Sequence, residues 1–306
     1  MNGAPHSVGE AQGLQAPRGG PIAYLRRRFG FNLDWITRPL FGLLLAGIAV
    51  AATIQGGATF ALFIAVGAIA GAREWHRMFS DKDYLVPTAI SALAIATSLA
   101  AAVAIAGERF ANFAVVLPFA ILAAGALLNL FAALLRGHSA RAAAAGVLYL
   151  GVAALSLVLL RLSAPHALWL VLVFFAAVWA TDTGALFLGN LIGGPKLAPV
   201  LSPNKTWAGF VGGIVCAGAA AALMALALRT AIVPALAFGA FVAVAGHLGD
   251  LFESFAKRRA GRKNSGSLIP GHGGVLDRID STLFAAPAAA ALILLAGFDP
   301  LAGLPP

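Results

Sequence analysis

The residues best suited to bind phosphate and metal lie in short polar segments of the second half of the chain, and the longer segment spans residues 246–281. If a helix continues through Lys257, then His247, Asp250, Ser254 and Lys257 stand at i, i+3, i+7 and i+10. These spacings place the four side chains on one helical face. A polar stripe that enters a membrane helix faces the bundle interior or a water-filled cavity.

Two more carboxylates follow at the start of the last apolar stretch. Asp277 and Asp280 are three residues apart, so they share one face of a helix. Together with Asp250 they bring three carboxylates from two helix ends toward one place. Oxygen-rich sites of this kind suit Mg²⁺, which keeps several waters and binds substrate phosphates.

Basic residues accompany these acids. Arg side chains suit bidentate phosphate contacts and Lys side chains supply point charges; the residues concerned are Lys257, Arg258, Lys263 and Arg278. Glycines around His272 allow the backbone to approach a ligand closely. The alternative is that the acids cap helices and the basic run anchors the chain at the membrane surface. The clustering of all these groups within 36 residues favours a binding site.

The other polar segment spans residues 182–207. It opens with Asp182, a carboxylate that is costly at a membrane helix end unless paired, hydrated or bound to a cation. Ser202 and Thr206 are good helix-start residues. With Lys205 they predict an anion site at the next helix N-terminus; a capped helix with an interfacial lysine is the alternative.

The sequence lacks the motifs of several other kinds of active site. The sequence has no GxxxxGK[ST] motif for a P-loop mechanism and no HExxH motif for a zinc protease. Its single cysteine, Cys216, can form neither an internal disulfide nor a cysteine-based zinc site.

The composition shows where these polar segments must be held. The 306 residues are 60% hydrophobic and only 11% charged, with a mean hydropathy of +0.88. A soluble domain carries about 25% charged residues. The net charge of +9 suits anionic lipids or phosphate substrates. We exclude nucleic acid as a partner because the basic residues fall in short loops between apolar runs.

We predict an all-α, polytopic membrane protein of about nine transmembrane helices, because apolar runs of about 17–25 residues recur along the chain. The expected spans are residues 39–54, 57–72, 86–107, 112–135, 142–160, 165–182, 207–228, 231–252 and 281–298. The first two are short and could instead form one helical hairpin, or one span with a re-entrant piece.

The expected domains are a disordered, basic cytoplasmic tail, residues 1–38, and a single transmembrane bundle, residues 39–306. Within the bundle, residues 39–181 form the N-terminal spans and residues 182–306 the catalytic part. A cleaved signal peptide is the alternative for the first residues.

The basic residues set the orientation. All of the 21 Lys and Arg residues except Arg109, Arg161 and Arg229 fall on the side of the N-terminal tail. The positive-inside rule makes that side cytoplasmic. Both polar segments therefore face the cytoplasm, and the C-terminus does not.

The polar motifs resemble those of the phosphatidate cytidylyltransferases, the CDP-diacylglycerol synthases. The match includes residues 249–254 (GDLFES), Lys257-Arg258 and residues 270–280 (PGHGGVLDRID). Residues 182–185 (DTGA) and 202–207 (SPNKTW) look like the same family. There are departures, because Asn264 stands where the pattern has Asp and Ala208 where many members have Glu.

The resemblance implies transfer of a cytidylyl group from CTP to phosphatidate, with Mg²⁺ and room for a second cation. It implies a multi-pass protein of a bacterial-type inner membrane, in contact with membrane lipids and compatible with a homodimer. Two rival functions are a CTP-dependent transferase for another lipid phosphate and a transporter of anionic substrates.

The resemblance also assigns roles to individual residues. Asp250 and Asp277 are expected as metal ligands, with Asp280 as a further candidate; these acids, Lys257 and Arg278 make up the catalytic set. Phosphate binding falls to Lys205, Lys257, Arg258, Lys263 and Arg278. Ser202, Ser254 and His272 are expected to orient phosphate or nucleotide.

Overall fold

The computed structural model describes residues 34–80, 83–106, 115–162, 166–266, 268 and 273–304. The chain divides into two units, residues 1–44 and 45–306, and the second carries the helix bundle. The expected tail lies outside the described residues up to residue 33, and so does His272. A helix begins at Asp34, so the last five residues of the expected tail are helical.

The described residues form an almost entirely helical protein, as predicted. The elements, in chain order, are α2 (Asp34–Gln55), α3 (Gly57–Phe79), α4 (Leu85–Ile105), α5 (Val116–Leu135), α6 (Ala140–Leu162), α7 (Ala167–Ile192), β1 (Lys196–Ala198), β2 (Ser202–Thr206), α8 (Trp207–Leu228), α9 (Ile232–Arg259), α10 (Leu276–Ala290) and the π-helical η1 (Ala291–Leu295). Within the described residues, eight helices are long and apolar enough to cross a membrane. The apolar part of α2, Gly42–Gln55, is shorter than a span.

Several helices run beyond the apolar spans expected from the sequence. α3 continues from residue 72 to Phe79, α9 continues to Arg259, and α10 begins at Leu276. The added turns carry polar residues that a hydropathy criterion rejects. They remain helical because several of those side chains are buried against other parts of the bundle, as Glu74 is. Helix α9 therefore does continue through Lys257.

A two-stranded antiparallel hairpin replaces the helix start expected at Ser202. In it Lys196 pairs with Thr206 and Ala198 pairs with Ser202. Helix α8 begins only at Trp207, and its N-cap is Thr206, whose hydroxyl accepts a hydrogen bond from Gly209 N at 3.1 Å. The prediction of a helix-start role was right for Thr206 and wrong for Ser202.

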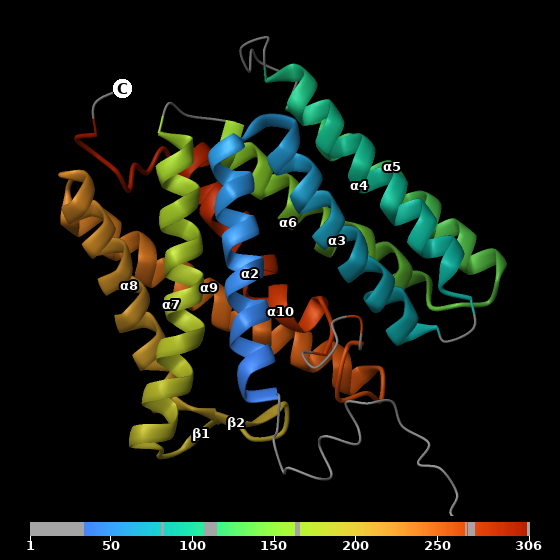
Figure 1. The fold of residues 1–306 in the computed structure, drawn as a ribbon. Helices are drawn as coiled ribbons and strands as arrows, with labels where there is room; N and C mark the ends of the chain where they lie inside the picture. Colours follow the sequence, from blue (N-terminus) through green and yellow to red (C-terminus); the bar gives the residue numbers. More distant parts are fainter. Residues whose placement is uncertain are drawn as a thin grey trace, which may run out of the picture. The chain divides into compact units, whose positions relative to one another are not determined.

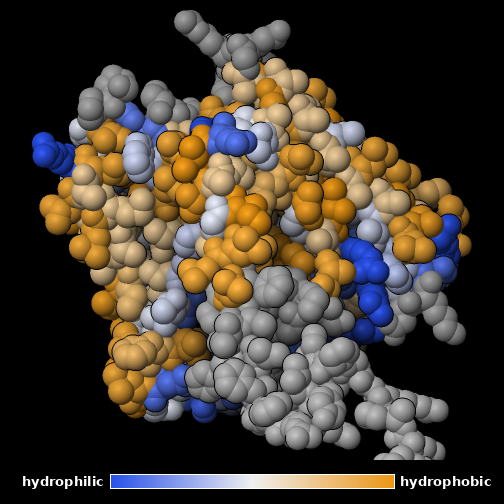
Figure 2. Space-filling view, in the orientation of Figure 1, coloured by the Kyte–Doolittle hydropathy of each residue, from blue (hydrophilic) through white to orange (hydrophobic). Residues whose placement is uncertain are grey.

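Helix α6 is the most enclosed helix of the bundle. Val147, Leu150, Leu155 and Leu160 are fully buried, and α6 packs against α3, α4, α5, α7 and α10. In Figure 1, α4 and α5 lie to one side of α6, while α7 and α8 lie to the other. Figure 2 shows apolar side chains over much of the visible surface of the described residues, as lipid contact requires.

Small residues bring helices α7, α8 and α9 close together. A Cβ atom on Gly239 of α9 would fall 2.4 Å from Ala217 O of α8. Membrane helices gain stability from this close backbone approach, since lipid provides no hydrophobic drive between helices. The end of α7, the hairpin and the start of α8 carry the polar segment 182–207, and α9 and α10 carry much of the segment 246–281.

Candidate active site

One face of α9 carries the centre of the site. Asp250, Glu253 and Lys257 are spaced three and four residues apart, so they point the same way near the C-terminal end of the helix. Glu253 is fully buried, and Asp250 and Lys257 are half-buried. Asp250 and Lys257, two members of the polar face expected from the sequence, therefore lie on this face, and α9 contacts α10. His247, also expected there, packs instead against Phe210 of α8.

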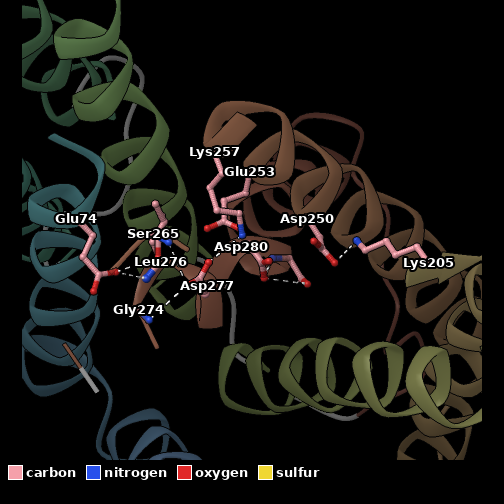
Figure 3. A network of polar contacts seen from close by, with 11 residues as sticks. Glu74, Lys205, Asp250, Glu253, Lys257, Ser265, Gly274, Leu276, Asp277 and Asp280 are labelled. Atoms are coloured by element: carbon pink, nitrogen blue, oxygen red, sulfur yellow. Dashed lines mark hydrogen bonds and ion pairs between the residues drawn. The ribbon is translucent and has the colours of Figure 1, made fainter. Parts of the chain in front are cut away.

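Lys257 joins α9 to α10. Its Nζ lies 2.7 Å from Glu253 Oε2 and 2.8 Å from Asp277 Oδ1. The three residues are labelled in Figure 3. A buried charge is tolerated only when it is paired and hydrogen-bonded. One ammonium group here serves two carboxylates.

The other oxygen of Asp277 binds backbone. Asp277 Oδ2 accepts hydrogen bonds from Ser265 N and Gly274 N, each at 3.3 Å. Asp277 lies in the first turn of α10, where a carboxylate also suits the helix dipole. Both of its oxygens are thus engaged, Oδ1 by the Lys257 ammonium group and Oδ2 by the two backbone N–H groups.

The two polar segments of the sequence meet at Asp250. Lys205 of β2 forms an ion pair with Asp250 Oδ2, and both residues are labelled in Figure 3. The hairpin is therefore needed to bring a second lysine to the acids of α9.

Three carboxylates gather beside these ion pairs. Ligand oxygens of Asp250, Glu253 and Asp280 all lie within 4.8 Å of one another. Glu253 Oε1 is buried and has no hydrogen-bond partner among the described residues. Hard oxygen ligands and an unpartnered buried carboxylate oxygen fit the requirements of Mg²⁺.

This grouping differs from the expected pairing of Asp250 with Asp277. Asp277 binds Lys257 on the neighbouring side, while Asp280, one turn later, joins Asp250. The reason is the helical spacing, because residues three apart share a face but not a single point. The metal role of Asp277 stays a prediction, and in the structure this residue holds Lys257.

The remaining predicted residues lie around this centre. Ser254 is buried on α9, and Ser202 is half-buried in β2. Arg258, Lys263 and Arg278 are exposed. Asn264, where the family pattern has Asp, is exposed as well.

Sequence reasoning missed Glu253 as a site residue, although its i, i+4 spacing to Lys257 could have indicated the ion pair. It also left Asp182 without a role. The structure places Asp182 Oδ1 3.2 Å from Ser281 Oγ, and Ser281 N donates to Asp280 Oδ1 at 2.8 Å. Asp182 of α7 thus borders the carboxylate cluster.

Comparison with known proteins agrees with these motifs. A model described as "Cytidylyltransferase family" matches residues 36–296. The phosphatidate cytidylyltransferase of Brucella suis biovar 1 (strain 1330) is 39% identical over 266 residues, covering 85% of this chain and 92% of the relative. The phosphatidate cytidylyltransferase of Staphylococcus haemolyticus (strain JCSC1435) is 33% identical over 256 residues, covering 82% of this chain and 95% of the relative. The phosphatidate cytidylyltransferase of Bacillus subtilis (strain 168) is 48% identical over 119 residues, covering 38% of this chain and 44% of the relative.

Proposed function

The chain belongs to the cytidylyltransferase family, and we propose that it transfers the cytidylyl group of CTP to phosphatidate, giving CDP-diacylglycerol and pyrophosphate. The relatives named for this activity support the proposal. The structural observation that carries it is the cluster in which Lys205 and Lys257 are paired with Asp250, Glu253 and Asp277. The cluster lies at the ends of membrane helices, where a lipid phosphate and a soluble polyanion can meet.

In the proposed reaction a phosphate oxygen of phosphatidate attacks the α-phosphorus of CTP. The bond from that phosphorus to the oxygen bridging the β-phosphorus breaks, and pyrophosphate leaves with the electron pair. No strong general base is needed, because the attacking oxygen is already ionised near pH 7. The main obstacle is repulsion between anions, which fixed cations and precise positioning reduce.

The lysines provide that positive charge. Lys257 is held from two sides, by Glu253 and Asp277, so its ammonium group has a defined place. Lys205 approaches from the hairpin and is held by Asp250. We expect Arg258, Lys263 and Arg278, exposed at the same end of α9 and α10, to attract the triphosphate toward the site.

Asp250, Glu253 and Asp280 are the residues we expect to hold Mg²⁺. When bound, the ion would neutralise phosphate charge and withdraw electrons from the reacting phosphoryl group. Ser281, hydrogen-bonded to Asp182 and next to Asp280, orients the last of the three.

The orientation follows from the basic loops: the site and the N-terminal tail face the cytoplasm of a bacterial-type inner membrane. Single cysteines in a Cys216→Ala background test this, because the sequence has no other cysteine. A membrane-impermeant maleimide should label Lys263→Cys from the cytoplasmic side and Ala231→Cys from the opposite side. The reverse pattern would contradict the proposed orientation.

The activity is tested with the purified full chain, labelled CTP, Mg²⁺ and either phosphatidate or an isoprenoid phosphate in liposomes. We expect label in the organic phase with phosphatidate, together with one pyrophosphate per labelled lipid. Label only with the isoprenoid phosphate would assign another acceptor. Uptake of unmodified nucleotide by sealed vesicles, without lipid product, would instead indicate a transporter. Transfer to phosphatidate would also show that Asn264 is tolerated.

A further inference from the structure

Glu74 is a buried carboxylate far from the polar segments in sequence. It lies in the last turns of α3 and is 2% exposed. A carboxylate in this position is costly unless other groups satisfy it. The groups that satisfy this carboxylate therefore indicate its role in the bundle.

The contacts of Glu74 lead to the segment between α9 and α10. Glu74 Oε2 accepts a hydrogen bond from Leu276 N at 2.9 Å and from Ser265 Oγ at 3.4 Å. Leu276 is the first residue of α10, so its N–H has no acceptor within the helix. Glu74 supplies that acceptor from another helix, as Figure 3 shows.

Two glycines leave room for this carboxylate. A Cβ atom on Gly266 would fall 2.4 Å from Glu74 Oε1, and its three nearest neighbours would all be Glu74 side-chain atoms. A Cβ on Gly274 would fall 2.6 Å from Glu74 Oε2. The backbone at Gly266 and Gly274 therefore passes so close to Glu74 that a larger residue at either position would meet its carboxylate.

The same stretch of backbone also binds Asp277. Ser265 and Gly274 donate their N–H groups to Asp277 Oδ2, while Ser265 Oγ and Leu276 N bind Glu74. The described part of the segment thus lies between two carboxylates, one from α3 and one from α10. Hydrogen bonds therefore connect Glu74 through Ser265 to Asp277, and Asp277 to Lys257.

We propose that Glu74 is a positioning residue, which fixes the segment before α10 so that Asp277 holds Lys257 in place for phosphoryl transfer. The expected fall in kcat rests on the proposed function. The expected order of the backbone before α10 rests on the hydrogen bonds of Glu74 alone. It gives the N-terminal half of the bundle a part in the reaction, although the candidate catalytic residues lie after residue 200.

Two substitutions test the kinetic consequence. Glu74→Leu keeps the approximate volume and removes the acceptor, and we expect kcat to fall by about 10- to 100-fold, with a smaller change in the KM for CTP. Glu74→Gln retains an oxygen that can accept from Leu276 N, so it should recover most of kcat. Failure of Gln to do better than Leu would overturn the proposal.

Asn129→Leu is the matched control. Asn129 is also fully buried in the N-terminal half, and its Nδ2 donates to Pro87 O at 3.0 Å and Ser91 Oγ at 3.1 Å. These contacts do not involve α9 or α10. An equal loss of kcat in Asn129→Leu would show that general destabilisation explains the effect.

A double-mutant cycle tests the contact itself. Gly266→Ala should lower kcat in the wild-type background, because its methyl group displaces the Glu74 carboxylate. In a Glu74→Ala background, where that carboxylate is absent, the same change should cost nothing further. Independent, multiplicative losses would contradict a shared mechanism.

Hydrogen exchange provides a readout that needs no activity. Backbone amides of residues 273–277 should exchange faster in Glu74→Leu than in wild type, and at the wild-type rate in Asn129→Leu. Unchanged exchange in Glu74→Leu would overturn the positioning role. A wild-type chain that transfers no label would refute the proposed function, and the exchange experiment would still decide whether Glu74 fixes the segment.

Discussion

Lys257→Met should separate the structural role of this lysine from its chemical role. The change keeps a long, flexible side chain but removes the ammonium group that lies between Glu253 and Asp277. The side chains of these three residues are 14%, 0% and 19% exposed, so water can replace the lost contact only poorly. Two neighbouring carboxylates then remain without their shared cation.

The expected loss can be worked out from these distances. Unit charges about 2.75 Å apart attract by about 6 kcal/mol at an effective dielectric constant of 20. The desolvation of the lysine offsets much of this attraction. Removing one partner of a buried ion pair therefore costs about 3–5 kcal/mol. At an unfolding entropy of about 2.1 cal/mol/K per residue, a chain of 306 residues loses about 1.6 °C per kcal/mol, so its unfolding temperature should fall by about 5–8 °C.

A second change isolates the cause. Adding Glu253→Gln to Lys257→Met removes one of the two carboxylates left without the ammonium group, so part of the lost stability should return. Cytidylyl transfer should remain absent in both variants, because the phosphate-binding cation is missing from each.

The assay is thermal unfolding of purified protein in detergent, followed by labelled-CTP transfer on the same samples. An unfolding temperature of Lys257→Met equal to that of wild type would refute the buried-pair reasoning. A double variant no more stable than the single one would refute it too. Transfer restored together with stability would show that Lys257 serves the fold alone.

Three other substitutions separate the carboxylate cluster from the packing that carries it. Glu253→Gln should raise the Mg²⁺ concentration for half-maximal transfer by about tenfold or more; a Mg²⁺ titration with an unchanged midpoint would argue against its role as a ligand. Thr206→Ala removes the N-cap of α8 and should cost about 1 kcal/mol, which a thermal melt detects as a lower unfolding temperature than wild type. Gly239→Ala should destabilise the bundle by about 1–3 kcal/mol through its contact with Ala217 O. In the same melts Gly67→Ala, which meets nothing within 4 Å, should be neutral or stabilising, and equal effects of the two glycine changes would contradict the packing argument.

The sequence was sufficient to predict most of the helices and the face of α9 that Asp250 and Lys257 share. Long apolar runs have few structural alternatives in a membrane, because every backbone polar group must be satisfied within the segment. The spacing of Asp250 and Lys257 then determined which face they share. These predictions depend on local periodicity, which a single sequence contains.

The hairpin was missed because its evidence is not local. Ser202 and Pro203 are good helix starters, and a five-residue strand has little periodicity of its own. The pairing of β1 with β2 and the ion pair of Lys205 with Asp250 stabilise the extended form instead. At Ser202 and Pro203 these tertiary contacts therefore outweigh the local propensity to start a helix.

The exact grouping of the acids also depended on tertiary structure. Asp277 and Asp280 are indistinguishable as metal ligands in the sequence, yet one binds Lys257 and the other joins Asp250 and Glu253. Glu74 carried a weaker signal, since it follows an apolar run whose expected end was residue 72. Its hydrogen-bond partners Ser265 and Leu276 lie 191 and 202 residues further along the chain, so no local pattern in the sequence indicates them.

The most direct test of the site is cytidylyl transfer by Asp277→Asn beside wild type, in membranes where both are expressed to the same level. Asp277 holds Lys257 and the backbone before α10, so we predict Mg²⁺-dependent label in the lipid phase for wild type and a loss of about 100-fold or more for the variant. Full transfer by Asp277→Asn would contradict the assignment of this carboxylate–lysine cluster as the active site.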